Sequence, residues 1–273
     1  MFINRCGIPK IIHYVWLGGK PLPDKFRNYI DGWKSLMPEY EFMEWNEDNF
    51  DLSVCKFAEE AYSRQKYAFS ADFIRIAVLK RYGGIYLDTD VEVLKPFDGL
   101  LENEFFLGFE NEAHVGSAVI GSVPDHPLVT ALYAFYLSTS FVNGKTLNMT
   151  PNVMYLTYLL RANYGLKPTP VTQRLTDGES SSVTVYAPEY FTPFNFNTRK
   201  ENITENSYAA HRFANSWSPK SLQSTQKFVN SVRKIVGKRI FALLVRLYAN
   251  AECRKAGKRI SSAKRNESRL VSI

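Results

Sequence analysis

The sequence has few of the features that would assign it to a structural class at once. Its 273 residues include only three cysteines, Cys6, Cys55 and Cys253. Their odd number and wide spacing exclude a zinc-knuckle pattern and argue against a disulfide framework, so we expect free thiols in a reducing compartment. No run of about 18 apolar residues occurs, which excludes an obvious membrane-spanning helix. The first residues also lack the pattern of a secretory signal peptide, and we therefore expect a cytoplasmic protein.

Acidic residues are scarce near the C-terminus. Residues 220–273 contain 14 Lys and Arg but 2 Asp and Glu, a net charge of +12, whereas residues 1–219 contain 20 and 25, a net charge of −5. The basic character therefore belongs to a tail, which argues against nucleic-acid binding by the whole chain. We expect a folded domain over residues 1–219 and a basic helical tail over 220–273. Aromatic residues make up 14% of the chain, which suits stacking on bases or sugars.

The order of predicted elements favours an α/β fold. Short runs rich in β-branched and aromatic residues predict strands at 9–18, 40–45, 85–94, 105–110, 116–123 and 181–194. Helical periodicity predicts helices at 23–38, 125–139 and 150–165, and one or two more within 52–84. Strands that alternate with helices predict a largely parallel sheet, whose ligands bind beyond the carboxyl ends of the strands.

The tail begins with an amphipathic pattern. From residue 227 to residue 248, apolar residues recur every three or four positions and Lys or Arg fill the gaps. We expect a basic amphipathic helix there, followed by a polar, basic and frayed segment at 251–270. Two alternatives are open for the helix: it lies in an anionic membrane interface, or it packs its apolar face on the domain.

A pair of carboxylates follows the strand predicted around Ile85 to Leu87. Asp88 and Asp90 come after the lead-in Gly83-Gly84, and residues i and i+2 of a strand point to the same side. Because a lone buried carboxylate is costly, a bound divalent cation with oxygen ligands, Mn²⁺ or Mg²⁺, is the simplest explanation. Such an ion would keep positions open for a diphosphate. The alternative is a solvated turn with no ligand.

A second charged pair precedes these carboxylates. Asp72 and Arg75 stand at i and i+3, so they share one face of the helix predicted upstream of the glycines. One interpretation is a surface ion pair of small energetic value. The other is a functional pair, in which Arg75 contacts phosphate and Asp72 accepts a hydrogen bond from a sugar hydroxyl.

The segment "SADFIRIAVLKRYGGIYLDTDVEVLKPFD" resembles the sugar-binding segment with the DXD motif of glycosyltransferase family 32. That family includes bacterial capsule and lipopolysaccharide transferases and yeast initiating mannosyltransferases, and the segment is also similar to that of the clostridial glucosylating toxins. "IPKIIHYVWLGG" resembles the family's first strand and "HRFANSW" its C-terminal signature. The resemblance spans residues 8–217 and implies a GT-A fold, a nucleotide-sugar donor, Mn²⁺ or Mg²⁺, and retention of anomeric configuration.

The resemblance also implies roles for individual residues. Asp88 and Asp90 match the metal and diphosphate motif, Asp72 and Arg75 match the pair that touches donor sugar and phosphate, and Tyr86 matches the aromatic residue before the motif. One departure is that Ala71 stands where many relatives have serine, with Ser70 one position earlier, which puts a hydroxyl contact to the donor in doubt.

The C-terminal signature supplies candidates for the rest of the metal and donor site. His211 is a candidate third ligand, and Asn215 and Ser216 compete with it for that role. Asn215, Ser216 and Trp217 are expected to close over the diphosphate. The alternative for His211 is a structural histidine at the end of a strand.

The remaining candidates are assigned by their place in the chain. Val15 and Trp16, at the end of the first strand, are expected to frame the base. Glu110, Asn111 and Gly116 are expected to line the sugar and acceptor side, in the segment that also holds His114. Asn152 is either a helix cap or an acceptor contact. His13 and His126 are weaker candidates, and His126 in "PDHP" is expected to serve a turn.

The expected function is a retaining, metal-dependent transfer of a hexose or N-acetylhexosamine from a nucleotide-sugar. The acceptor is expected to be a lipid-linked glycan of bacterial surface polysaccharide synthesis, reached at the inner face of the plasma membrane. The donor stays open among UDP-Gal, UDP-GlcNAc, UDP-Glc and GDP-Man. Three alternatives compete: a non-catalytic, membrane-peripheral nucleotide-sugar-binding protein, a phosphatase of the haloacid dehalogenase type, and a toxin-like transferase that acts on protein.

Overall fold

The fold is built around one mixed sheet, seen in a computed structural model that describes residues 7–111, 114–179, 181–195, 200–214, 243 and 247–263. In this part of the chain, the sheet has seven strands in the spatial order β2 (Glu41–Trp45), β1 (Ile11–Val15), β3 (Gly84–Leu87), β6 (Val119–Ser122), β5 (Phe105–Gly108), β10 (Ser182–Tyr186) and β9 (Gln173–Thr176). Strands β6 and β9 run against the other five. The predicted α/β fold with a mostly parallel sheet is confirmed.

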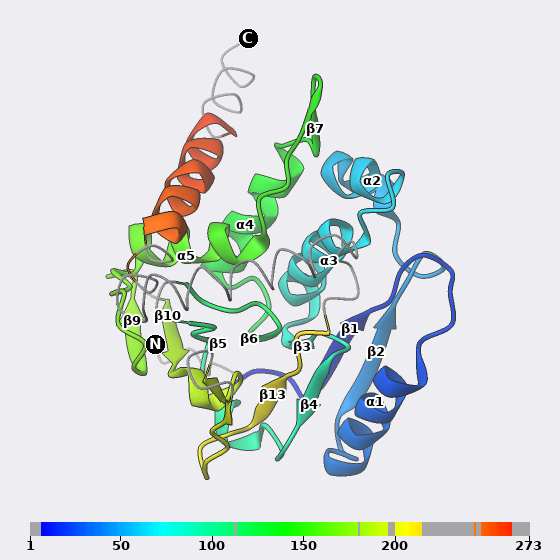
Figure 1. Cartoon of the computed structure of the whole chain (residues 1–273), viewed down its shortest axis with the longest axis vertical. Coiled ribbons are helices and arrows are strands. Elements are labelled where there is room, and N and C mark those ends of the chain that lie inside the picture. The colour runs from blue at the N-terminus through cyan, green and yellow to red at the C-terminus, as the bar shows by residue number, and fades with distance from the viewer. Residues whose placement is uncertain are drawn as a thin grey trace, which may run out of the picture.

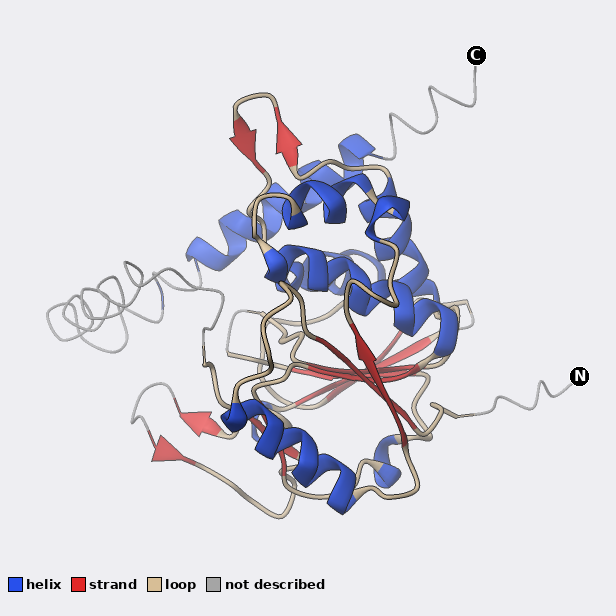
Figure 2. Cartoon of the chain, turned by 90° about the vertical axis from the view of Figure 1, so that its right-hand side faces the viewer, coloured by secondary structure: helices blue, strands red, loops and turns tan. Residues whose placement is uncertain are grey.

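Helices cover both faces of the sheet (Figures 1 and 2). One face carries α2 (Lys56–Tyr62), α3 (Tyr67–Tyr82), α4 (Pro127–Leu137) and α5 (Asn152–Asn163), and the other carries α1 (Asp24–Leu36). Each face has its own cluster of buried apolar side chains, the larger one under α2 to α5. The sheet is therefore buried on both sides, as expected for a sheet with several parallel strands.

Helix α1 shows how the sequence sets these positions. Its buried residues Phe26, Ile30 and Trp33 are spaced by four and three, so they form one stripe that faces the sheet. The Trp33 indole Nε1 donates a hydrogen bond of 2.9 Å to the carbonyl oxygen of Val91, just beyond the two carboxylates. The helix predicted at 23–38 is confirmed, and it supports the segment that follows the site.

Helix α3 leads directly into β3 through two glycines with positive φ. Gly83 has a φ of +64° and Gly84 a φ of +91°, values that favour glycine. A Cβ on Gly84 would lie 2.6 Å from the carbonyl oxygen of Ile11 in β1. The glycine pair therefore lets the chain leave the helix and enter the sheet beside β1 without a loop.

The shorter elements lie around this frame. Strand β4 (Val91–Val93) pairs antiparallel with β13 (Ala209–His211), outside the main sheet. The other short elements are the hairpins β7 (Val142–Asn143) with β8 (Thr146–Leu147) and β11 (Phe194–Asn195) with β12 (Lys200–Glu201), and the 3₁₀ turns η1 (Leu52–Val54), η2 (Asp98–Leu100) and η3 (Pro188–Tyr190). Sequence patterns did not predict β9 or the hairpins, because most of these strands are only two residues long.

The C-terminal helix, residues 247–263, lies beside α5 (Figure 1). Its buried residues are spaced by three or four and are mostly small: Ala249, Cys253, Ala256, Ile260 and Ala263. A Cβ on Gly257 would lie 2.2 Å from the ring of Tyr158, so the two helices approach closely there. The expectation of a frayed segment is wrong for residues 251–263, because these small side chains form a packing stripe.

Most of the amphipathic helix predicted at 227–248 lies outside the described residues. Within the described part of the tail, the helix joins the core of the domain, because Ala256, Ile260 and Ala263 belong to the larger apolar cluster. None of the helices that could be searched is long and apolar enough to cross a membrane.

Candidate active site

The two aspartates of the DXD motif lie in a turn between β3 and β4. The strand ends at Leu87, and the amide of Val91 donates a hydrogen bond of 3.0 Å to the carbonyl oxygen of Asp88, which closes the turn. The amide of Asp88 donates to the carbonyl oxygen of Ala118, 2.9 Å away. The prediction that strand alternation orients both carboxylates is wrong in this detail. The turn directs them to a common space instead, just beyond the carboxyl end of β3.

Asp88 receives two hydrogen bonds on one oxygen. Nη2 of Arg75 lies 2.8 Å from Oδ1 of Asp88, and the hydroxyl of Tyr86 lies 3.0 Å from the same atom. The guanidinium of Arg75 also lies over the ring of Tyr86, 4.3 Å from its centre. These contacts fix the orientation of the Asp88 carboxylate from α3 and β3.

Asp72 and Arg75 form a buried pair, not a surface pair. Their side chains are 14% and 5% exposed, and Oδ1 of Asp72 lies 3.6 Å from Nη1 of Arg75. Burial raises the pKa of Asp72 to about 6, because the lowering effect of Arg75 only partly offsets it and the charge of Asp88 adds to it. The i, i+3 spacing thus places both side chains on the face of α3 that looks toward the DXD turn.

Arg75 still has hydrogen-bonding capacity. Its Nε and Nη1 atoms are buried, and no acceptor among the described residues satisfies them. A buried donor without an acceptor is costly, unless a ligand supplies the acceptor. A phosphate oxygen or a sugar hydroxyl beside Asp72 and Asp88 would do so.

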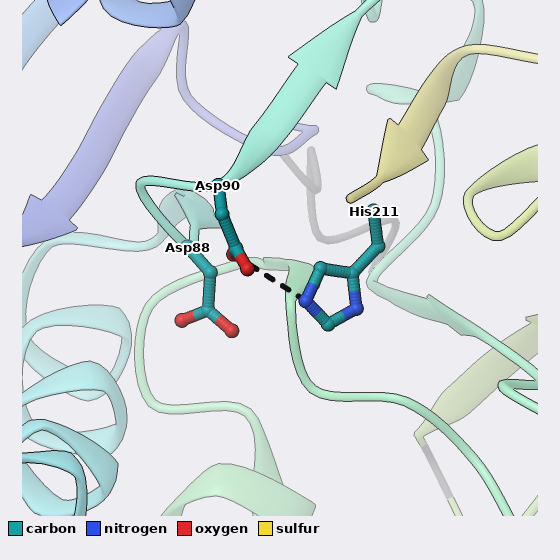
Figure 3. A group of neighbouring side chains, drawn as sticks. All are labelled: Asp88, Asp90 and His211. Carbon is teal, nitrogen blue, oxygen red and sulfur yellow. Dashed lines mark ion pairs between the residues drawn. The ribbon is translucent and has the colours of Figure 1, made fainter. Parts of the chain in front are cut away.

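His211 comes to the motif from a distant part of the sequence. Strand β13 pairs with β4 so that His211 lies opposite Val91, and Nε2 of His211 lies 3.3 Å from Oδ1 of Asp90. The amide of Ala214 donates a hydrogen bond of 2.8 Å to Oδ2 of Asp90. Figure 3 shows all three side chains directed at one space.

The pKa values of this pair reflect their contact. Burial alone would raise the pKa of Asp90, but its hydrogen bond and charge interaction with His211, together with the amide of Ala214, lower it. For His211, burial would lower the pKa, and the bonds and charges of Asp90, Asp88 and Glu110 raise it instead. Negatively charged side chains therefore surround the ring nitrogen of His211.

Three potential ligand atoms converge here. Asp88, Asp90 and His211 each offer one atom, and all of these atoms lie within 4.8 Å of one another. Two carboxylate oxygens and one imidazole nitrogen suit Mn²⁺ well and Mg²⁺ less well, since imidazole is a softer ligand. The residues therefore fit a divalent cation. Of the predicted third ligands, His211 is brought to the motif, whereas Asn215 and Ser216 lie outside the described residues, as does Trp217.

The predicted base-binding residues lie at the same edge of the sheet. Val15 ends β1, which runs parallel to β3 and pairs with it directly. The Val15 side chain is buried in the core. The indole Nε1 of Trp16 donates to the carbonyl oxygen of Lys20, 2.6 Å away, and its ring contacts Phe26. Their role toward a base stays a prediction.

Of the three residues predicted to line the sugar and acceptor side, only Glu110 and Gly116 lie near the motif. The charge of Glu110 acts on His211, and Gly116 lines a small cavity of about 10 Å³ beside the same ring. Asn111 instead holds its own loop, because its side chain bonds to His114. The structure thus brings Glu110 and Gly116 near the carboxylates, and their roles stay predictions.

The weaker candidates serve the structure. His126 accepts a hydrogen bond from the amide of Leu128 and caps α4, as expected of a turn residue. Asn152 does not cap α5 with its side chain. Its Nδ2 donates to the carbonyl oxygen of Asp72, 3.2 Å away, and its Oδ1 is buried without a partner in the described part of the chain. Asn152 therefore positions Asp72, and an acceptor contact stays a prediction.

Sequence reasoning missed the groups that hold the C-terminal signature in place. Nε and Nη2 of Arg212 lie 2.7 Å and 2.5 Å from Oε2 of Glu92, and Arg212 also pairs with Glu201. Phe213 has a φ of +46°, rare for a residue with a side chain, and its ring centre lies 4.0 Å from that of His211. The one indication of such a role in the sequence is that Arg212 and Phe213 directly follow His211.

Comparison with known families agrees with this geometry. Residues 23–107, from α1 through the DXD turn to β5, match the family model described as the glycosyltransferase sugar-binding region containing the DXD motif. Over these residues the chain is similar to the DXD-containing glycosyltransferases. Within their sugar-binding region lie Asp72, Arg75, Tyr86, Asp88 and Asp90, whereas His211 comes from outside the matched residues.

Curated relatives carry the same kind of enzyme name. An uncharacterized glycosyltransferase of Acanthamoeba polyphaga mimivirus is 27% identical over 224 residues, which cover 78% of this chain and 84% of that protein. Inositol phosphoceramide mannosyltransferase 2 of Schizosaccharomyces pombe is 32% identical over 135 residues, which cover 44% of this chain and 36% of that protein. The chain thus spans most of the viral protein but about a third of the yeast one.

A solved structure supports the fold. The PaToxG glycosyltransferase superposes with a TM-score of 0.50 at 18% identity, over 57% of this chain and 70% of that one. At this identity the likeness concerns the fold alone, and it agrees with the GT-A fold predicted from the sequence.

Proposed function

We propose that this DXD glycosyltransferase transfers a hexose or N-acetylhexosamine from a nucleotide diphosphate-sugar to an acceptor hydroxyl. We further propose that the reaction depends on a divalent cation, Mn²⁺ or Mg²⁺, held by Asp88, Asp90 and His211. The observation that carries the proposal is the convergence of these ligand atoms beside a buried arginine whose Nε and Nη1 find no acceptor among the described residues. A donor diphosphate would have a positive group on each side, the cation and the guanidinium of Arg75.

The residues of the chain have separable tasks in this proposal. A bound cation supplies Lewis-acid stabilisation of the departing phosphate. Arg75 donates from Nε and Nη1 to phosphate oxygens and is held ready for this by Asp88, Asp72 and the ring of Tyr86. Asp72 accepts from a sugar hydroxyl, because its carboxylate lies beside Arg75 and is oriented by Asn152.

Retention of anomeric configuration is part of the proposal and rests on the family resemblance. The transition state is expected to be oxocarbenium-like, as in other reactions at a glycosidic carbon. In a front-face reaction, the bond from the sugar C1 to the diphosphate oxygen breaks while the acceptor oxygen bonds to C1. The acceptor's proton then passes to the leaving phosphate, so no protein nucleophile is needed.

For the acceptor, we propose a lipid-linked glycan or glycolipid. The yeast relatives are named for mannosyl transfer to inositol phosphoceramide, which is a lipid, and this supports a lipid-linked acceptor and keeps GDP-mannose among the candidate donors. A role in bacterial surface polysaccharide synthesis rests on the sequence resemblance alone, since the relatives named above are viral and fungal. UDP-linked donors are equally part of the proposal.

The test is donor hydrolysis and transfer with purified protein and Mn²⁺. Replacing Asp88 by asparagine removes a charged ligand and should lower turnover by about 10³-fold or more, with the fold intact. Asp31→Asn, on α1 away from the site, is the matched control and should keep full turnover. Near-normal turnover in Asp88→Asn would refute the assignment.

The same assay decides between the enzyme and its alternatives. A non-catalytic nucleotide-sugar-binding protein would bind the donor but release no sugar with any acceptor. A phosphatase of the haloacid dehalogenase type would cleave a phosphomonoester, whereas the transferase leaves it intact. The family match over residues 23–107 favours transfer over both.

A further inference from the structure

The C-terminal helix, residues 247–263, has one face that no described part of the domain covers. Its small residues pack on α5, and away from this contact it leaves two large apolar side chains exposed, Leu247 at 54% and Tyr248 at 67%. Leu243, which precedes the helix, is 56% exposed. In the sequence, Leu243 stands four positions before Leu247, a spacing typical of one side of a helix. Apolar side chains gathered on an exposed helical face mark a surface that meets another apolar phase.

Basic side chains lie further along the same helix, toward its C-terminal end. Arg254, Lys255 and Lys258 are exposed, and residues 247–263 hold four basic residues against the single acid Glu252, a net charge of +3. Lys255 pairs with Glu252 at 2.6 Å, whereas Arg254 and Lys258 form no ion pair with any residue that the structure describes. An anionic partner would complement this charge.

A cleft beside the exposed face adds a second, independent feature. It has a volume of about 280 Å³ and is lined by Tyr158, Arg161, Asn250, Cys253 and Arg254. Nη1 of Arg161 donates a hydrogen bond of 2.9 Å to Oδ1 of Asn250, so α5 and the C-terminal helix together hold the guanidinium at the cleft. Two arginines and a tyrosine in one cleft suit a phosphate group.

We propose that this face docks the protein on an anionic phospholipid membrane, with lipid phosphate in the cleft and Leu243, Leu247 and Tyr248 inserted between the headgroups. Charge argues against the nearest rival, a second copy of the chain, because pairing this face with itself would bring together two surfaces with a net positive charge. The apolar residues favour a membrane over a soluble polyanion, since a polyanion offers them no apolar phase. The proposal does not depend on the transferase activity.

Flotation with lipid vesicles tests the proposal on the full-length protein. We expect binding to vesicles of phosphatidylcholine mixed with phosphatidylglycerol, and little binding to phosphatidylcholine alone. Arg254→Glu should weaken binding about tenfold or more, because a cation is lost and an anion added near the surface. Leu247→Glu should weaken it by a similar factor, since its side chain can no longer enter the interface.

Matched controls carry the same changes elsewhere. Lys25→Glu on α1 reverses an exposed charge, and Val54→Glu in η1 replaces an apolar side chain of similar exposure, 51%. Both controls should float like the wild type. Hydrolysis of a nucleotide-sugar in solution should be unchanged in Arg254→Glu and Leu247→Glu, which separates a failure of docking from a failure of the proposed catalysis.

Several outcomes would overturn the proposal. One is equal flotation of the wild type, Arg254→Glu and Leu247→Glu, and another is equal binding to neutral and anionic vesicles. A third is binding of inorganic phosphate in the cleft without any binding to vesicles. Self-association that Leu247→Glu abolishes, again without vesicle binding, would assign the face to a second copy and equally refute it.

Discussion

At the scale of single residues, the site is dominated by one buried cation. The guanidinium of Arg75 is buried away from water and contacts Asp88, Asp72 and the ring of Tyr86 instead. A buried ion pair contributes little net stability, because desolvation offsets most of the attraction. The arrangement is better explained by the ligand that its remaining N–H groups would bind than by the stability of the fold.

A second buried polar residue, His13, is structural, and its tautomer is fixed. Nε1 of Trp45 donates to Nδ1 of His13 at 3.1 Å, and Nε2 of His13 lies 2.9 Å from the carbonyl oxygen of Gly83, to which it donates. A second proton on the ring would face the indole donor. Burial therefore lowers the pKa of His13 to about 4, and the bond to Gly83 only partly counteracts it.

This predicts a loss of stability in mild acid. The unfolded chain takes up a proton on His13 as the pH falls through 6.5, whereas the folded chain does so only near pH 4. The contribution of His13 to the free energy of unfolding should therefore be fully present above pH 6.5. Between pH 7 and pH 5 this contribution should fall by about 2 kcal/mol. Urea unfolding at both pH values measures it.

The matched variant for this prediction is His13→Gln, which keeps a donor and an acceptor but does not titrate. It should lose about 2 kcal/mol less than the wild type over the same pH interval. If both proteins lost the same amount of stability, His13 would not be the source of the acid sensitivity.

Residue types near the motif were predictable because they are local. Asp72, Arg75, Tyr86, Asp88 and Asp90 lie within one helix–strand–turn unit. Spacing pairs Asp72 with Arg75 and Asp88 with Asp90, and the family resemblance implies that both pairs and Tyr86 share one site. The sequence could not choose among His211, Asn215 and Ser216 as a third ligand, because that depends on how a distant strand pairs. The structure brings His211 to the pair of aspartates through the contact with Asp90.

At the scale of elements, the passage from α3 to β3 positions the site. The helix ends at Tyr82, and the strand begins only two residues later, at Gly84. The connection between Arg75 on the helix and Asp88 after the strand is therefore short and leaves little freedom in their relative position. The two glycines were read from the sequence as a lead-in, and their positive φ values explain why no other residue suits them.

A pair of glycine substitutions tests this. Gly84→Ala places a methyl group 2.6 Å from the carbonyl oxygen of Ile11, at a φ that disfavours side chains, and should lower the free energy of unfolding by about 2–4 kcal/mol. Gly32→Ala, inside α1 with nothing within 4 Å of the new methyl group, should raise it by about 0.5–1 kcal/mol. Chemical denaturation measures both. Equal effects of the two substitutions would contradict this account of the connection.

The pairing of β4 with β13 shows what element patterns cannot supply. Both strands are three residues long, and their paired residues are about 120 positions apart, as for His211 and Val91. Strands this short carry no detectable period, and register between distant segments is set by packing. For the same reason, a turn at Asp88–Asp90 was considered only as a solvated alternative with no ligand, since the strand on each side was read as one continuous run.

At the scale of the whole molecule, the C-terminal helix is part of the core and not an appendage. Its described residues reach the apolar cluster under α2 to α5, so the division at residue 219 does not separate two independent cores. Composition suggested the division, because the charge changes sharply there. Overall composition carries no information on spacing. The buried residues at 249, 253, 256, 260 and 263 are spaced by three or four, and through them the helix packs on α5.

A charge in this contact should release the helix. Ala256 is fully buried, so Ala256→Glu would bury an unpaired carboxylate, which costs several kcal/mol and is avoided by detachment of the helix. Amides of residues 247–263 should then exchange hydrogen much faster, with the sheet still protected. Ser262→Glu, at an exposed position of the same helix, is the control and should leave exchange unchanged. Unchanged protection in Ala256→Glu would contradict the packing described here.

The central claim is that Asp88, Asp90 and His211 hold a cation for the donor diphosphate. The most direct measurement is anomalous diffraction from crystals grown with Mn²⁺ and a nucleoside diphosphate. The account predicts a single strong manganese peak bonded to at least Asp88 or Asp90, with diphosphate oxygens on the ion and on Arg75. Manganese and diphosphate bound elsewhere, with both aspartates directed into solvent, would contradict it.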